Sequence, residues 1–222
     1  MIKEKLRRGT FLYKFYLYYH LFFRYKFFYR KKNYSQFKED YFLADFFKEK
    51  TYGKFVDLGA FHPMKYNNTY LLYKKGWRGI NIDLNETSID MFNIVRSKDE
   101  NKCALISNES DIKKTVYFEH NFSAVNSMTS SVGLKKKKIM ISTTFDQLVK
   151  DRFDFLNIDL EGHDFEVLKT INLNKYSPKL ICIEILDSSK NKDNIYNYMK
   201  KFKYEFIKQC NISYFFKNKN IF

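Results

Sequence analysis

From residue 35 onward the chain alternates short apolar runs with longer amphipathic stretches, and this alternation restricts the fold more than any other feature. The apolar runs, which predict β-strands, lie at 54–58, 79–82, 103–106, 115–119, 153–158 and 180–185. Stretches with helical periodicity separate them, at 39–50, 69–75, 86–96, 164–171 and 193–202. Strands that alternate with helices form a mostly parallel sheet with helices on both faces. We therefore expect an α/β fold, closed by an antiparallel strand pair at 204–208 and 214–217.

The first 34 residues differ in composition, and we interpret them as an appendage to a single domain over residues 35–222. They contain ten lysines and arginines but one acid, so they carry +9 of the total net charge of +15. Phenylalanine and tyrosine recur at helical spacing over residues 10–29, which predicts a basic aromatic helix. This helix is apolar nearly all round, so it either packs on its own domain or a partner subunit, or lies in a membrane interface. The sequence leaves both alternatives open.

The cysteines and the N-terminal sequence favour a cytoplasmic protein. Cys103, Cys182 and Cys210 are odd in number and form no C-x-x-C pair, so we expect reduced thiols. The early apolar run lacks a small-residue cleavage site, and its uncharged stretch at 15–23 is too short to span a bilayer. A peripheral position at the inner membrane face is the alternative that the basic aromatic segment suggests.

The sequence FVDLGAFHP, at residues 55–63, has the pattern of a strand that turns tightly against a ligand. The acid Asp57 comes at the end of the strand, and Gly59 permits a turn in which the backbone approaches the ligand. The next strand ends at Asp83, 24 positions after Gly59, close to the spacing at which a strand-end carboxylate meets ribose hydroxyls. The pattern predicts a nucleoside site, although an ordinary strand and turn with solvent-facing acids is the alternative. The absence of G-x-G-x-x-G argues against a dinucleotide.

The sequence FDFLNIDLEGHD predicts a second group of functional residues beyond a buried strand. If the chain stays extended there, Asp159, Glu161 and His163 face one way and form a general-base or metal cluster. His163 precedes a predicted helix, whose positive end disfavours the imidazolium form. The alternative is a helix cap, in which Asp159 or Asp164 binds free backbone N–H groups. Glu184 ends the next strand and is expected at the same cleft.

These segments resemble the FkbM-type methyltransferases. The resemblance runs from about residue 35 to residue 184 and rests on SQFKEDYFL, the stretch ending in GWRGINID, the D-x-E-G signature and PKLICIEI. It implies a class I methyltransferase with a Rossmann-like fold and S-adenosylmethionine as the methyl donor. It also implies O-methylation of a sugar or polyketide hydroxyl.

Carried onto this chain, the resemblance assigns three groups of residues. The donor-binding group is Asp57, Gly59, Ala60 and Asp83, with Asp57 near the methionine moiety; Asp99 and Ser107 are adenine-side candidates; Asp159, Glu161 and His163 form the acceptor side. The chain departs from the family at Lys38, where many members have glycine. It departs again at Pro63, where the general donor loop has glycine, which leaves the loop conformation and its contact with the methionine carboxylate open.

The function that we expect is O-methylation of a carbohydrate hydroxyl, in a nucleotide-linked sugar or a surface polysaccharide such as capsule or lipopolysaccharide. His163 or Asp159 would be the base, and Glu161 would orient the acceptor. A divalent metal at Asp159 and Glu161 is a less favoured alternative. The charge of +15 suggests a nucleic-acid methyltransferase, but it is concentrated near the N-terminus and no D/N-P-P-Y motif occurs. A non-catalytic scaffold at a membrane surface is the remaining alternative, and a homo-oligomer is compatible with each of these functions.

Overall fold

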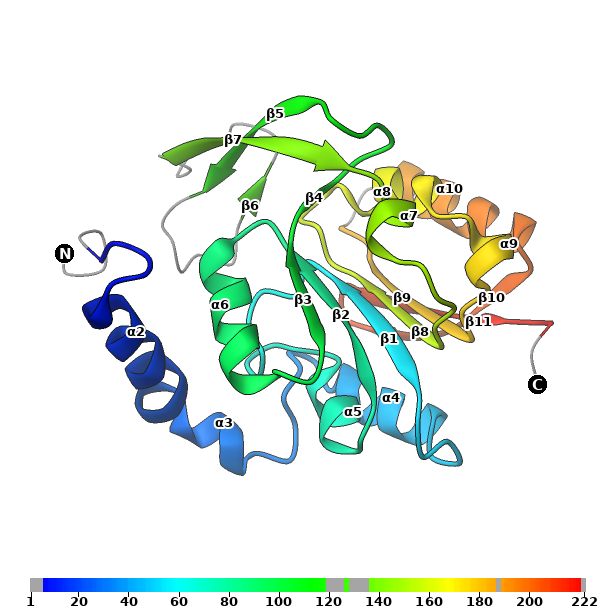
Figure 1. Cartoon of the computed structure of the whole chain (residues 1–222). Coiled ribbons are helices and arrows are strands. Elements are labelled where there is room, and N and C mark those ends of the chain that lie inside the picture. The colour runs from blue at the N-terminus through cyan, green and yellow to red at the C-terminus, as the bar shows by residue number, and fades with distance from the viewer. Residues whose placement is uncertain (1–5, 119–125, 128–135, 187–188, 221–222) are drawn as a thin grey trace.

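A seven-stranded sheet forms the centre of the protein in a computed structural model that describes residues 6–118, 126–127, 136–186 and 189–220 (Figure 1). The strand order is β10-β11-β9-β8-β1-β2-β3. Their bounds are β1 Lys54–Leu58, β2 Arg78–Asp83, β3 Glu100–Cys103, β8 Phe155–Ile158, β9 Leu180–Glu184, β10 Tyr204–Cys210 and β11 Ser213–Asn218. Strands β9, β8, β1, β2 and β3 pair in parallel, whereas β11 is antiparallel to both β9 and β10. The expected α/β fold and its closing antiparallel pair are confirmed.

Helices cover both faces of this sheet because its central strands are apolar on both sides. One core packs Phe55, Phe155 and Leu180 against helices α4 and α5. The other packs Val56, Leu156 and Ile181 against α7 to α10. The helices are α4 Glu39–Phe46, α5 Tyr70–Lys74, α6 Glu86–Val95, α7 Phe145–Leu148, α8 Asp164–Thr170, α9 Leu173–Tyr176 and α10 Ser189–Lys201.

A second, small sheet contains the strand expected at 115–119, which is β5, together with β6 and β7, which the sequence patterns did not identify. Its order is β4-β7-β5-β6, with β4 Leu105–Ile106, β5 Lys113–Phe118, β6 Asn126–Ser127 and β7 Lys136–Thr143. The strand expected at 103–106 is therefore divided between the two sheets. The basic run from Lys136 to Lys138 belongs to β7. Ile139 and Ile141 are exposed, so β7 lacks the buried apolar run by which strands are recognised.

The N-terminal segment forms α2 Phe11–Tyr18, a π-helix η1 Tyr19–Arg24, and α3 Lys26–Arg30 along one side of the domain (Figure 1). Tyr13, Leu17 and Leu21 are buried in a cluster with residues of α5 and α6. The Tyr13 hydroxyl donates a hydrogen bond of 2.7 Å to Asp90 on α6. One side of the segment is thus docked on the domain. No helix among the described residues has the length and apolar character needed to cross a membrane.

Candidate functional site

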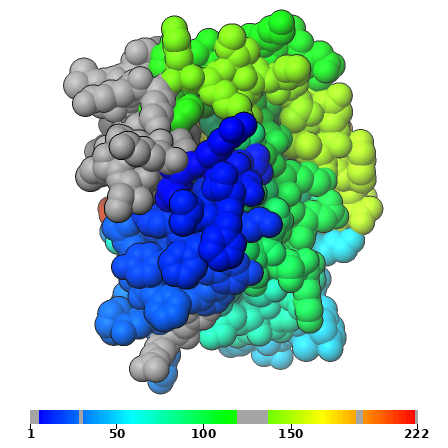
Figure 2. Space-filling model, turned by 60° about the vertical axis from the view of Figure 1, so that its left-hand side comes forward, coloured from blue at the N-terminus to red at the C-terminus, as the bar shows by residue number. Residues whose placement is uncertain are grey.

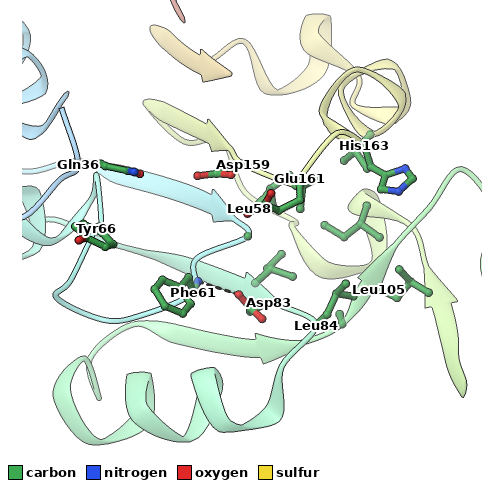
Figure 3. A pocket seen from close by; sticks show the side chains of 16 residues that line it. Gln36, Leu58, Phe61, Tyr66, Asp83, Leu84, Leu105, Asp159, Glu161 and His163 are labelled. Carbon is green, nitrogen blue, oxygen red and sulfur yellow. Dashed lines mark hydrogen bonds between the residues drawn. The ribbon is translucent and has the colours of Figure 1, made fainter. Parts of the chain in front are cut away.

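A cavity of about 300 Å³ opens where β1, β2 and β8 reach their carboxyl ends (Figure 3). Its apolar wall includes Ile82, Leu84, Ala104, Leu105 and Ile106. Its polar side chains are Gln36, Asp83, Asp159, Glu161 and His163, with Tyr66 at the side of Gln36. No lysine or arginine is among the described residues that line it. The cavity therefore has a largely apolar section and an acidic section, at the edge of the sheet where α/β folds bind ligands.

Asp83 connects the loop that follows β1, called here the donor loop (residues 59–69), to the start of α6. Its Oδ2 accepts a hydrogen bond of 2.8 Å from the Phe61 backbone N–H, and its Oδ1 accepts one of 2.7 Å from that of Asn85. Burial raises the pKa of Asp83 to about 6. Because each carboxylate oxygen can accept a second hydrogen bond, Asp83 can still bind a ligand hydroxyl while it holds both backbone segments.

Gly59 lies where β1 and β8 approach most closely. Its φ is +77°, and a Cβ at this position would lie 1.7 Å from the carbonyl oxygen of Asp159. The N–H groups of Gly59 and Ala60 both donate to the carbonyl of Ile82, at 2.9 and 3.2 Å. Ala60 is buried and is not part of the cavity lining, so its contribution is to the turn rather than to the cavity wall.

The two departures from the family pattern are accommodated by the backbone. Lys38 has a φ of +68°, a left-handed conformation that glycine favours, which matches the glycine of other members. After Pro63 the loop is fixed by His62, whose Nδ1 accepts hydrogen bonds from the N–H groups of Met64 and Lys65, at 3.2 and 3.0 Å. Burial lowers the pKa of His62 well below its usual value, so the ring stays neutral and can accept both bonds.

Asp57 is directed away from the cavity. Its Oδ2 accepts hydrogen bonds from Thr69 at 2.8 Å and Asn67 at 3.3 Å, and its Oδ1 accepts one of 2.8 Å from Asn157. The side chain is buried, and burial raises its pKa, an effect that the nearby Arg96 opposes. Asp57 therefore fixes the loop that follows β1 and does not line the cavity, contrary to its expected place beside the methionine moiety.

Asp99 lies at the amino end of β3, away from the cavity. Its carboxylate pairs with the guanidinium of Arg96 at 2.8 Å, and both side chains are fully buried. It also accepts hydrogen bonds from the N–H of Gly79 and from Asn81, each at 3.1 Å. A residue that precedes a strand cannot reach the carboxyl edge of a parallel sheet, so the expectation that Asp99 lies on the adenine side needs correction.

Asp159 and Glu184 form a pair of carboxyl groups at the ends of two adjacent strands. The register of β8 and β9 sets Ile158 beside Ile183, so the residues that follow are neighbours. Asp159 keeps solvent-exposed surface at the cavity, but the protein packed around its carboxyl group, with a further contribution from Glu184, raises its pKa well above its usual value. Burial raises the pKa of Glu184 to about 7, although a hydrogen bond with Asp159 opposes the shift. Glu184 Oε2 is buried and has no hydrogen-bond partner among the described residues.

The segment after Asp159 turns instead of staying extended. Glu161 and Gly162 have φ values of +51° and +93°, and Asp164 accepts hydrogen bonds from the N–H groups of Leu160 at 2.9 Å and Gly162 at 3.0 Å. Asp164 thus binds backbone N–H groups of the turn before α8, whereas the helix cap that was the alternative is not formed, because no side chain caps α8. Figure 3 shows Asp159 and His163 on opposite sides of Glu161. The extended conformation on which their common orientation depended is therefore not formed, although all three side chains line the cavity.

His163 is half-buried in the cavity wall, and burial lowers its pKa. The expected neutral form is therefore favoured, with burial as the main cause. Ser107 follows β4 and is buried, but it is absent from the cavity lining; its hydroxyl accepts a hydrogen bond of 2.6 Å from Lys114. Its neighbours Leu105 and Ile106 line the cavity instead.

The sequence patterns missed two sets of residues. Gln36, Phe61 and Tyr66 line the cavity from loops that have no periodicity. Arg96 was treated only as the end of a helix, yet it donates hydrogen bonds to Asn67 and Thr69 at 3.1 and 2.9 Å and pairs with Asp99. A signal for Arg96 existed, because two acids buried near one another require a cation.

Comparison with known proteins identifies the family. The family model described as "Methyltransferase FkbM domain" matches residues 57–206, about two thirds of the chain. The chain belongs to the FkbM methyltransferase family. Among solved structures, a putative RNA methyltransferase from Pyrococcus horikoshii matches with 10% sequence identity and a TM-score of 0.48, over 82% of each chain. No curated protein gives a significant match.

Family membership makes this protein a methyltransferase, with S-adenosylmethionine implied as its donor. The residues of the cavity fit that donor. The apolar wall suits an adenine ring, Asp83 can accept from ribose hydroxyls, and Gly59 leaves the backbone uncovered between them. Among the described residues, no group of three or more His, Cys, Asp and Glu side chains has an arrangement that could hold a metal ion.

Proposed function

We propose that this FkbM-family methyltransferase transfers the methyl group of S-adenosylmethionine to a hydroxyl of a carbohydrate. The observation that carries this proposal is the position of the Asp159–Glu184 pair, beside the same cavity that Asp83 lines. A single cavity thus has a carboxylate suited to ribose and a separate carboxyl pair suited to an acceptor. The acceptor would be a nucleotide-linked sugar or a glycan of a surface polysaccharide.

The donor side of the proposal rests on Asp83 and the wall formed by Leu84, Leu105 and Ile106. Figure 3 shows Asp83 between the side chain of Phe61 and that of Leu84. A ribose bound to Asp83 would have room for its base on the apolar side and for the rest of the donor toward Asp159. Gly59 lines the same cavity, and a larger residue there would collide with the carbonyl oxygen of Asp159.

The acceptor side rests on a carboxyl pair that can take up one proton. S-adenosylmethionine supplies an electrophilic methyl group on a sulfonium, which becomes a neutral thioether after transfer. The acceptor hydroxyl must lose its proton as its oxygen bonds to the methyl carbon, and Asp159, in its ionised form, can accept that proton. Glu184 raises the proton affinity of Asp159, and Glu161 lies close enough to orient the acceptor. His163 is a weaker candidate because Glu161 separates it from Asp159.

The charge of the cavity favours a carbohydrate over a nucleic acid. Carboxylates accept hydrogen bonds from the many hydroxyl groups of a sugar. A nucleic acid would bring phosphates to a cavity that has Asp159, Glu161 and Glu184 nearby and no lysine or arginine among its described lining residues. Phosphate binding normally requires such cations.

Donor binding tests the first half of the proposal. Loss of the hydrogen bonds from ribose should cost about 1–3 kcal/mol, so Asp83→Ala should weaken S-adenosylmethionine binding about 5- to 150-fold in calorimetry. Asp151→Asn, at an exposed position beside the start of β1 at the other end of the sheet, is the control for loss of an acid and should keep the donor affinity. A folded Asp83→Ala protein that binds the donor normally would contradict the assignment.

A methyl-transfer screen with labelled donor over nucleotide sugars, surface glycans and RNA tests the second half. On the best acceptor, Asp159→Asn should lower kcat by about 10²–10⁴-fold and leave the donor affinity nearly unchanged. His163→Ala should retain more turnover than Asp159→Asn. Transfer to RNA but to no carbohydrate, or full activity of Asp159→Asn, would refute the proposal.

A further inference from the structure

The outer side of the N-terminal segment exposes a dense set of large apolar side chains. These are Phe11, Leu12, Phe15, Tyr18, Tyr19, Phe22, Phe23 and Phe27. Phe11 is 80% exposed and Phe23 is 68% exposed, which is unusual for phenylalanine on a helix that is docked on its other side. Figure 2 shows this segment across the surface, next to α6. A large exposed apolar patch on the surface of a protein indicates an interaction site.

The segment is held in place independently of this outer side. Tyr13, Leu17 and Leu21 are buried against the domain. Arg8 donates two hydrogen bonds to Asp90 on α6, at 2.7 and 2.8 Å. The contacts that hold the segment on the domain therefore do not involve the exposed rings. Substitution of the outer side chains need not detach the segment from the domain.

Cations surround the exposed rings without matching acids. Lys14, Arg24, Lys26, Lys31 and Lys32 are exposed, and none forms an ion pair with a described carboxylate. No acid occurs between residues 5 and 34. Aromatic rings suit the headgroup region of a bilayer, and lysine and arginine are attracted to anionic lipid. The segment therefore exposes both the aromatic rings and the cations that an anionic membrane surface attracts.

We propose that α2, η1 and α3 form a peripheral membrane-binding surface that recognises anionic lipid headgroups. The exposed rings enter the interface while Tyr13, Leu17 and Leu21 keep the segment on the domain. A second copy of this chain is a poor occupant, because a symmetric contact would bring the cations of two copies together. Single-stranded RNA is also a poor match, because the exposed rings project from helices and the groove that Tyr18 lines also contains the acid Asp90.

The test uses the full chain and vesicles of phosphatidylcholine with or without 30% phosphatidylglycerol. Wild type should float with the anionic vesicles at low salt, and less at high salt because salt screens the charges. Phe11→Ser/Phe15→Ser should abolish most of this binding. The matched control is Tyr52→Ser/Ile139→Ser, which removes side chains of similar exposure elsewhere and should float normally.

The charge requirement needs its own pair of variants. Lys14→Gln/Lys26→Gln should weaken binding about fivefold for each cation removed. Lys98→Gln/Lys200→Gln makes the same change in net charge away from the segment and should bind as wild type does. Thermal melting of all four variants verifies folding.

Three results would overturn the proposal. They are equal binding of wild type to neutral and anionic vesicles, equal loss in the segment variants and their controls, and no flotation at low salt. A dimer that sedimentation detects and Phe11→Ser/Phe15→Ser removes, with no vesicle binding, would assign the surface to a second copy. Retention of RNA without vesicle binding would assign it to nucleic acid.

Discussion

At the scale of single residues, Gly59 and Gly162 both have positive φ values, +77° and +93°, but their surroundings differ. A Cβ on Gly59 would overlap the Asp159 carbonyl oxygen at 1.7 Å, whereas nothing lies within 4 Å of one on Gly162. Only Gly59 is required by a close approach of two strands. At position 162, glycine is favoured over other residues only because the backbone has a positive φ, in a turn that Asp164 fixes.

This difference predicts unequal effects of alanine. Gly162→Ala should lower the free energy of unfolding by about 1 kcal/mol, the cost of a side chain in the left-handed region. Gly59→Ala adds a backbone clash to that strain and should cost about 3 kcal/mol or more. Urea unfolding of the two variants measures both. Equal stability of the two would show that β1 and β8 separate without penalty and that the close approach is not a constraint.

At the scale of elements, a buried polar network joins the donor loop to the sheet and to α6. Arg96, at the end of α6, binds Asn67 and Thr69 in the loop and Asp99 before β3. Asp57 on β1 holds the same two loop residues. The loop is thus fixed from two elements at once, which explains how a segment with few apolar contacts can support a binding site.

Removal of Arg96 should therefore be costly. Arg96→Met leaves two buried acids without their cation, and the loss of one partner of a buried pair costs about 3–5 kcal/mol. Arg8→Met is the control, because Arg8 also pairs with an acid but is about half exposed. This substitution should lower the free energy of unfolding by about 1 kcal/mol or less. Chemical denaturation compares the two. If both variants lose equally little stability, the network does not hold the loop.

At the scale of the whole molecule, acidic side chains are concentrated at the carboxyl edge of the sheet, and their pKa values are raised. Burial raises the pKa values of Asp83 and Asp164 to about 6, and that of Glu184 to about 7. These groups bind protons more readily in the folded protein than in the unfolded chain. Each therefore stabilises the fold at low pH, and that contribution is lost as the pH rises through its folded pKa.

Glu184→Gln isolates one of these groups. The glutamine cannot ionise, so the variant should gain stability relative to wild type as the pH rises from about 4.5 to about 7, with little further change above that range. Urea unfolding at several pH values gives the difference. A difference that is constant with pH would mean that Glu184 titrates normally.

Local patterns in the sequence determined the strands of the main sheet, the helices α4, α5, α6, α8 and α10, the antiparallel closing pair, and the positions of Gly59 and Asp83 at the cavity. These depend on periodicity and on chain spacing, which a parallel sheet converts directly into position. The same patterns could not assign side chains to a face. Asp57 must point opposite to Val56 and Leu58, but which face bears the cavity is settled only when the helices pack.

Other features depended on contacts between residues distant in the chain. Asp164 turned the chain after Asp159 and moved His163 to the other side of Glu161. Asp99 paired with Arg96 at the opposite edge of the sheet. For the N-terminal segment, the sequence specified charge and aromatic content, and packing on α5 and α6 decided which rings were buried. Burial of a polar or aromatic group depends on partners from other elements, and a single stretch of sequence does not contain them.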